Sequence, residues 1–194
     1  MQKLKLVSEI LIPVFLFTNC GKDQNAVRYN NNEDEICSCE VPIDAYIIYG
    51  LILDRLDLSI YQDIILVNDS TKSVESYELE HFQFEKIKEQ YPALQEDTYN
   101  NFLELSPQKC KLDSLPPTNK TDVYFYSDYS GLITDLAVYG LISFSCAGFN
   151  SDNSQAIIYA QDYRAPLNAT AYLSVFEKEN NQWIFKFYLL LWIS

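Results

Sequence analysis

The sequence has few of the side chains and motifs on which catalytic sites are usually built. Its one histidine, His81, lies in the segment "YELEHFQFEK" beside several glutamates, whereas a general base or metal ligand needs other convergent partners. We therefore interpret His81 as a surface residue. The chain also contains no GxSxG, HExxH, Walker-type glycine loop or EF-hand spacing. The sequence thus nominates no catalytic residue, no metal site and no cofactor, and it favours a protein that is not an enzyme.

Positive charge is also scarce. The chain has 14 Lys and Arg residues against 27 Asp and Glu residues, which gives a formal net charge of −13 at pH 7. Such a chain repels polyphosphates and anionic lipid head groups at long range, and no cluster of basic residues offsets this repulsion locally. Nucleic acid is therefore excluded as an expected partner.

The apolar run near the start of the sequence is too short to span a membrane, which takes about 20 residues. It covers residues 10–17, is interrupted by Pro13, and follows the basic residues Lys3 and Lys5. A charged start, a brief apolar segment and a cleavage site describe a secretory signal. We therefore predict that residues 1–19 form a signal peptide.

The residue that would follow the cleavage site is Cys20. The segment "FTNC", residues 17–20, resembles the lipobox of bacterial lipoproteins, and "NCG" is similar to the corresponding segment in lipoproteins of the Bacteroidetes type. This resemblance implies that fatty acid is attached to Cys20, where each buried methylene contributes about 0.8 kcal/mol to membrane binding. It also implies a location in the bacterial cell envelope, at the periplasmic or surface face of the outer membrane. An ordinary signal peptide and an uncleaved anchor stay open as alternatives.

The rest of the chain divides into a tether and one domain. Residues 20–36 are polar and show no apolar periodicity, so we predict a spacer between membrane and domain. Residues 37–194 suit a single domain, because a chain of this length buries roughly 70 % of its unfolded surface around one core.

Four cysteines remain in the predicted domain: Cys37, Cys39, Cys110 and Cys146. Because an exported protein meets an oxidising compartment, we expect the Cys37-Ser38-Cys39 segment to be linked to Cys110, to Cys146 or to both. Closing loops of this length would contribute about 3–4 kcal/mol each. Free buried thiols stay open as an alternative, as does a structural zinc site, although the paired CxxC spacing of such sites is missing.

Periodicity predicts an α+β domain in which N-terminal helices pack on a C-terminal, four-stranded antiparallel meander. We expect helices over residues 42–56, 77–91, 95–105 and part of 128–138, and strands over residues 63–69 and 122–128. The four strands of the meander are expected over residues 140–149, 155–163, 170–178 and 183–193.

The last strand of the meander is apolar on both faces. Strict alternation would place Trp183, Phe185 and Phe187 on one side and Ile184 and Tyr188 on the other. A strand with two apolar faces is predicted to be central in its sheet or covered by helices, because a bare edge of this kind would be prone to aggregation.

The C-terminal half resembles an uncharacterised family of exported bacterial proteins with a region of the form "SRVGFN…ALVYV…W…LWxS". The matching residues are Gly140, Ser145, Gly148, Phe149, Asn150, Ala156, Tyr159, Lys178, Trp183, Trp192 and Ser194. Cys146 stands where that family has arginine, and the resemblance implies no activity. The order of helices and meander is also similar to that of cone-shaped, nuclear-transport-factor-two-like domains, an analogy of fold alone.

Aromatic residues are abundant, with 15 Tyr, 11 Phe and 2 Trp. A buried phenol needs a partner for its hydroxyl, so we expect several tyrosines to line a groove or an exposed sheet face. The candidates for this surface are Tyr124, Tyr126, Tyr129, Tyr159, Tyr163 and Tyr172. We predict a non-catalytic envelope module that binds a protein, peptide or glycan. Two alternatives stay open: a hydrolase of envelope polymers that uses paired carboxylates, and tyrosines that cap a small β-core.

Overall fold

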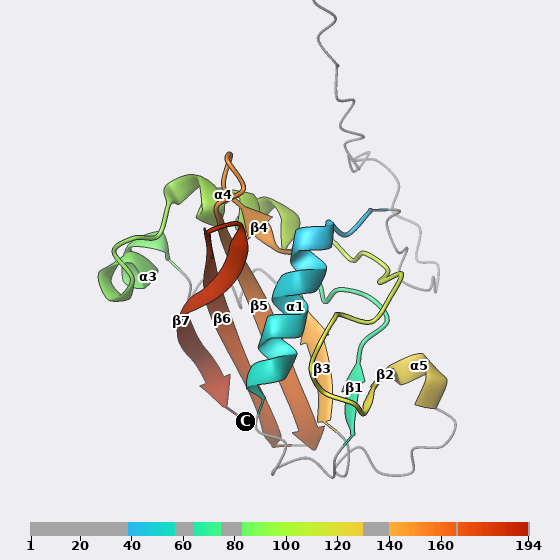
Figure 1. Ribbon diagram of the computed structural model, residues 1–194. Coiled ribbons are helices and arrows are strands. Elements are labelled where there is room, and N and C mark those ends of the chain that lie inside the picture. Colours follow the sequence, from blue (N-terminus) through green and yellow to red (C-terminus); the bar gives the residue numbers. More distant parts are fainter. Residues whose placement is uncertain (1–38, 57–63, 75–82, 130–139, 166, 194) are drawn as a thin grey trace, which may run out of the picture. The chain divides into compact units, whose positions relative to one another are not determined.

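The computed structural model describes residues 39–56, 64–74, 83–129, 140–165 and 167–193, all of which belong to one compact unit, Glu35–Ser194 (Figure 1). The predicted signal peptide, Cys20, the tether, Cys37 and His81 lie outside the described residues. The same holds for most of the short helix expected within residues 128–138.

Within the described residues, seven strands form one mixed sheet with the order β2-β1-β3-β5-β6-β7, and β4 pairs separately with β5. The strands are β1 (Ile65–Val67), β2 (Val123–Phe125), β3 (Gly140–Phe144), β4 (Gly148–Phe149), β5 (Gln155–Ala165), β6 (Asn168–Glu179) and β7 (Gln182–Ile193). β1 runs parallel to β2 and β3, whereas the pairs from β3 to β7 are antiparallel.

The predicted α+β class is confirmed, but the prediction of a four-stranded sheet is wrong. The segments expected as separate strands near residues 63–69 and 122–128 join the meander as β1 and β2. Their pairing is parallel and joins segments far apart in the sequence, so no local turn signal marks it. The strand expected over residues 140–149 is divided into β3 and β4, and the intervening Ser145 donates its backbone N–H to the carbonyl of Tyr159.

The helices cover both faces of the sheet. They are α1 (Ile43–Arg55), α3 (Phe84–Gln90), α4 (Glu96–Leu105) and the short α5 (Tyr126–Tyr129). Pro42 is the residue before α1 rather than its first helical residue, and its fixed φ suits this boundary. A break containing Pro92 separates α3 from α4, as the sequence predicts.

Two hydrophobic clusters lie on opposite faces of the sheet. On one face, α1 packs against β3, β5 and β6, and Figure 1 shows this helix running along the sheet. Tyr49 of α1 stacks on Phe144 with ring centroids 4.6 Å apart, and its hydroxyl donates to the carbonyl of Ser145 at 2.9 Å. On the other face, Ile87 of α3 and Phe102 of α4 pack against residues of β5 and β6.

β7 departs from its predicted geometry at two bulges. Phe176 of β6 pairs with Phe185, but the preceding Val175 pairs with Phe187, so Lys186 is an extra residue in β7. Phe185 therefore packs in the cluster beneath α1, whereas Phe187 packs on the opposite face. Leu191 is a second extra residue between Leu190 and Trp192. The predicted strict alternation is wrong, because each bulge reverses the faces that follow it.

The last strand was predicted to be central in its sheet or covered by helices, and the first of these two alternatives is wrong. Among the described strands, β7 pairs with β6 alone and therefore forms an edge. Its outer positions are well exposed, with Tyr188 58 % and Ile193 70 % accessible. The two bulges limit the hazard of this apolar edge, because they interrupt the flat run of backbone groups onto which another strand could pair.

Hydrogen bonds and a close backbone contact fix α1 on the sheet. At its first turn, the Asp44 carboxylate accepts hydrogen bonds from Trp183 Nε1 at 2.9 Å, Lys178 Nζ at 3.1 Å and Asn153 Nδ2 at 2.6 Å. Further along, a Cβ at Gly50 would lie 1.7 Å from the carbonyl oxygen of Pro117, so only glycine allows the loop to approach the helix this closely.

Replacing Asp44 by Asn tests the attachment of α1. Burial alone would raise the pKa of Asp44, but hydrogen bonds from Trp183, Asn153 and Lys178 hold this pKa below its ordinary value. A depressed folded-state pKa stabilises the fold at a pH above the unfolded value of about 3.9 and loses this effect as the pH falls through the folded value. We expect Asp44→Asn to lower the free energy of unfolding by about 2 kcal/mol at pH 7.

The measurement is urea denaturation at a series of pH values, followed by circular dichroism and by tryptophan fluorescence. The difference between Asp44→Asn and wild type should shrink as the pH falls below 4. Glu40→Gln removes a neighbouring exposed carboxylate and serves as the matched control, with little expected change. A deficit of the same size at pH 3 and pH 7 would show that the carboxylate charge does not stabilise this contact.

Candidate ligand-binding site

A pocket of about 280 Å³ lies between α1 and the strands β5, β6 and β7. We call it the α1 pocket; it is found where the C-terminal end of α1 lies over the sheet (Figure 1). Its walls are formed by Ile52 and Arg55 of α1 and the following Leu56, Asp162 and Arg164 of β5, Thr170, Tyr172 and Ser174 of β6, and Phe185 and Tyr188 of β7.

The geometry of the strands explains why these side chains converge. Residues two apart in a regular strand share a face, which aligns three hydroxyl side chains on β6. On β5, Arg164 lies at an irregularity between Tyr163 and Ala165 and pairs with Asp162. Phe185 and Tyr188 are three apart and would lie on opposite faces of a regular strand. The bulge at Lys186 places both on the face of α1. The aromatic wall of the pocket therefore depends on an irregularity in β7.

An ion pair lies at one side of the α1 pocket. Arg164 donates from Nε at 3.0 Å and from Nη2 at 2.5 Å to the same carboxylate oxygen, Oδ2, of Asp162. The Asp162 side chain is 4 % exposed and that of Arg164 is 22 % exposed. Because a buried carboxylate is costly without a cation, this pair fixes both side chains in place.

Arg55 brings a second cation to the pocket. Its guanidinium carbon lies 3.7 Å from the centroid of the Phe185 ring, a close cation–π contact. The arginines of the chain are Arg28, Arg55 and Arg164, and two of these three line this pocket. The described residues of the pocket wall thus include two cations and one carboxylate in a protein with a net charge of −13.

Three hydroxyl groups form a polar strip along β6 inside the pocket: those of Thr170, Tyr172 and Ser174. Burial raises the pKa of Tyr172, and the charge of Asp162 raises it further, while Arg164 partly opposes these effects. The phenol is therefore protonated at neutral pH. Each of these groups can both donate and accept a hydrogen bond.

The structure does not gather the six predicted tyrosines on one surface. Tyr159 is fully buried in the cluster beneath α3 and α4, so its prediction as a binding-surface residue is wrong, because its ring fills the core. Tyr172 lines the α1 pocket. Tyr163 lies between Asp162 and Arg164 on β5, and the alternation of the strand turns it to the opposite face.

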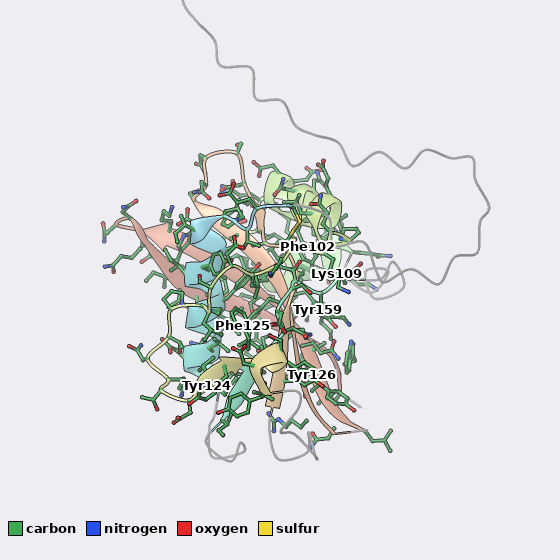
Figure 2. The ribbon with its side chains drawn as sticks, turned by 90° about the vertical axis from the view of Figure 1, so that its right-hand side faces the viewer. Phe102, Lys109, Tyr124, Phe125, Tyr126 and Tyr159 are labelled. Atoms are coloured by element: carbon green, nitrogen blue, oxygen red, sulfur yellow. A yellow bond between two sulfur atoms is a disulfide. The ribbon has the colours of Figure 1, made fainter. Side chains whose placement is uncertain are left out.

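The other three tyrosines belong to β2 and α5, at the far edge of the sheet. Tyr124 of β2 and Tyr129 of α5 are partly exposed, with ring centroids 4.7 Å apart, and Tyr126 begins α5. Figure 2 shows Tyr124 and Tyr126 at this edge, away from Tyr159. The Tyr124–Tyr129 pair is separate from the α1 pocket.

The predicted disulfide involving the Cys37-Ser38-Cys39 segment is found between Cys39 and Cys110, which are 71 residues apart. Cys146 is a buried free thiol whose Sγ lies 3.2 Å from Cys110 Sγ and 3.4 Å from Thr71 Oγ1. Burial raises the pKa of Cys146, which keeps it in the unreactive thiol form. Among the described residues, no group of three or more His, Cys, Asp or Glu side chains is placed to hold a metal ion.

The chain matches no family model, no curated protein and no solved structure. In the part of the chain that the structure describes, no helix has the length and apolar character needed to cross a membrane. The resemblance to the uncharacterised exported family therefore stays a prediction.

Most residues of this site, including Arg55, Asp162 and Arg164, were not predicted. One local signal was present, because the hydroxyl residues of "TAYLS" lie two apart on a predicted strand and therefore share a face. Asp162 lies near the end of the strand predicted over residues 155–163, whereas Arg164 lies just beyond that strand, so no pattern joined the two. Nothing local connects these segments with Arg55, which is about a hundred residues earlier in the chain.

Removing the disulfide tests its contribution to stability. In the chain-entropy account, a cross-link that closes a 71-residue loop stabilises the fold by about 4 kcal/mol. We expect Cys39→Ser to lower the free energy of unfolding by about this amount. The change is made in a Cys146→Ala background, because Cys146 lies close enough to Cys110 to replace Cys39 as its partner.

The measurement is chemical denaturation of Cys146→Ala with and without Cys39→Ser, together with peptide mapping under non-reducing conditions. Reducing the disulfide of Cys146→Ala should lower its free energy of unfolding to that of the variant that also carries Cys39→Ser. Equal stability of both variants before reduction, or a mapped peptide that links Cys110 to Cys37, would contradict the assigned pairing.

Proposed function

We propose that this protein is a non-catalytic ligand-binding module of the bacterial cell envelope, anchored by fatty acid on Cys20 once residues 1–19 have been removed. Residues 20–36 then act as the tether of a single domain. The "FTNC" segment supports the anchor. The disulfide between Cys39 and Cys110 supports export, because such bonds persist in oxidising compartments and are rare in the cytosol.

The observation that carries the binding function is the α1 pocket. Sites for small ligands are concave and largely apolar, with a few convergent polar groups that fix the orientation of the ligand. The α1 pocket combines an aromatic wall of Phe185 and Tyr188 with hydroxyl groups and two arginines. Of the tyrosines predicted to form a surface, Tyr172 is the one that lines it.

The ligand proposed here is a small molecule, or the terminal group of an envelope peptide, protein or glycan. A volume of about 280 Å³ is just below the roughly 300–1,000 Å³ of pockets that hold drug-sized ligands. The fold-level analogy with cone-shaped, nuclear-transport-factor-two-like domains is kept as part of the proposal. It is supported by one long helix packed along the antiparallel part of a mixed sheet that bulges.

A hydrolase of envelope polymers finds less support in this pocket. Glycosidases of the common type need two carboxyl groups about 5–9.5 Å apart. Asp162 supplies the one carboxylate among the described residues of the pocket wall, and Arg164 holds it in an ion pair. Among the described residues, the pocket wall therefore lacks the second carboxyl group that this mechanism needs.

Filling the pocket tests the binding function. Thr170 lines the pocket and is partly exposed, so Thr170→Phe should occupy the space without disturbing the core. Thr121→Phe makes the same chemical change at an exposed loop position and is the matched control. Wild type and both variants are mixed with sugar fragments and peptides released from the envelope of the bacterium that makes the protein, and native mass spectrometry detects bound species.

We expect a bound species on wild type and Thr121→Phe and at least a tenfold lower bound fraction on Thr170→Phe. Thermal melting checks that each variant is folded. Tyr188→Ala removes an exposed side chain of the pocket wall and should also weaken binding. Equal binding by Thr170→Phe and wild type would place the ligand elsewhere on the protein.

The lipid anchor is tested on protein made in its own host. We expect the first residue to be Cys20 and the intact mass to exceed that of residues 20–194 by the mass of attached acyl chains. Cys20→Ser should leave the acyl mass absent and the protein unattached to membranes. An intact leader, or an unmodified sulfur at Cys20, would contradict this part of the proposal.

A further inference from the structure

The charge of the α1 pocket selects the kind of ligand that it can hold. Asp162 and Arg164 neutralise each other in their ion pair. Arg55 takes part in none of the ion pairs that the described residues form with one another. Among the described residues of its wall, the pocket therefore has an excess positive charge at Arg55, which is a natural partner for an anionic group on a ligand.

Arg55 is held where it can bind such an anion. Its guanidinium carbon lies 3.7 Å from the centroid of the Phe185 ring, and the N–H donors of a guanidinium lie in its own plane. A planar guanidinium can donate two parallel hydrogen bonds to a carboxylate, which gives geometric selection as well as charge. The position at the C-terminal end of α1, where the helix dipole is negative, further favours a cation here.

The hydroxyl strip on β6 favours a ligand with several hydroxyl groups. Thr170, Tyr172 and Ser174 present a row of groups that donate and accept hydrogen bonds along one side of the pocket. A simple aromatic acid would remove water from these groups and return no hydrogen bonds, at a cost of about 1–3 kcal/mol for each group left unpaired. A ring that carries hydroxyls would satisfy them.

The adjacent strand β7, where Tyr188 pairs with Ser174, offers an apolar surface for such a ring. Tyr188 is 58 % exposed, and its ring offers a flat face beside Phe185, with ring centroids 6.3 Å apart. The C–H groups on one face of a pyranose ring form an apolar surface that can pack against an aromatic face. At about 280 Å³, the pocket has room for one ring rather than for a long chain.

We propose that the α1 pocket binds a single carboxylated sugar residue of the hexuronic acid class. Arg55 pairs with its carboxylate, the β6 hydroxyls bind its hydroxyl groups, and Tyr188 packs on its ring. This inference rests on the proposed function, in which the α1 pocket is the ligand-binding site. The sugar acid is either free or the end of an acidic polysaccharide.

The test is a titration of the purified full-length protein, followed by isothermal calorimetry and by saturation-transfer NMR. The probes are methyl glucuronide, the neutral methyl glucoside, benzoate, and a disaccharide that ends in glucuronate. We expect methyl glucuronide to bind at least tenfold more tightly than methyl glucoside and benzoate. Tighter binding of the disaccharide would identify the end of a polysaccharide as the source, and equal binding would identify the free sugar acid.

Variants separate the charge from the hydroxyl groups. Arg55→Gln should weaken binding of methyl glucuronide about tenfold or more and leave that of methyl glucoside nearly unchanged. Lys111→Gln removes one positive charge at an exposed site outside the pocket and is the matched control. Thr170→Val keeps the side-chain shape and should weaken both sugars.

The outcomes distinguish this inference from the proposed function. Unchanged glucuronide affinity in Arg55→Gln, or tighter binding of benzoate than of glucuronide, would overturn the sugar-acid assignment. If no sugar acid binds while Thr170→Phe still abolishes binding of an envelope species, the ligand class is wrong and the binding function stands. If no sugar acid binds and Thr170→Phe does not affect the binding of any envelope species, both the sugar-acid assignment and the binding function are wrong.

Discussion

The packing of α1 on the sheet is the contact on which the rest of this structure depends. Tyr49 stacks on Phe144 at the centre of the contact, and Asp44 fixes one end of the helix by accepting hydrogen bonds from residues of β6, β7 and the β4–β5 turn. Gly50 lets the segment at Pro117 lie directly against the helix backbone. These contacts fix the position of α1 on the sheet. The α1 pocket is the space between the C-terminal end of this helix and the strands β5, β6 and β7.

The irregular edge strand turns this space into a site with a defined chemistry. A regular β7 would carry Phe185 and Tyr188 on opposite faces, and the pocket would have half of its aromatic wall. The bulge at Lys186 places both rings beneath α1, and Phe185 then supports Arg55 through the cation–π contact. The same bulges interrupt the exposed apolar edge, so one backbone feature shapes the pocket and protects the sheet.

Charge is distributed unevenly in this acidic protein. With a net charge of −13, the molecule repels anions at long range, yet two of its three arginines meet in one pocket. At the short distances inside a partly desolvated site, local charges outweigh the screened field of the surface. An anionic ligand would therefore bind through contact geometry and not through long-range attraction. The proposed export and lipid anchoring, together with the Cys39–Cys110 cross-link, would place such a ligand in the cell envelope.

Much of the local structure follows from the sequence alone. The apolar spacing of α1, the break at Pro92, the antiparallel strands of the C-terminal third and the cross-link of the CxC segment are encoded by neighbouring residues and by cysteine chemistry. Only the tertiary structure decided the parallel pairing of β1 and β2, the two bulges, the edge position of β7 and the burial of Tyr159. It also brought Arg55 to the Asp162–Arg164 pair. These features depend on contacts between residues far apart in the chain, and such contacts leave no periodic signal in either segment.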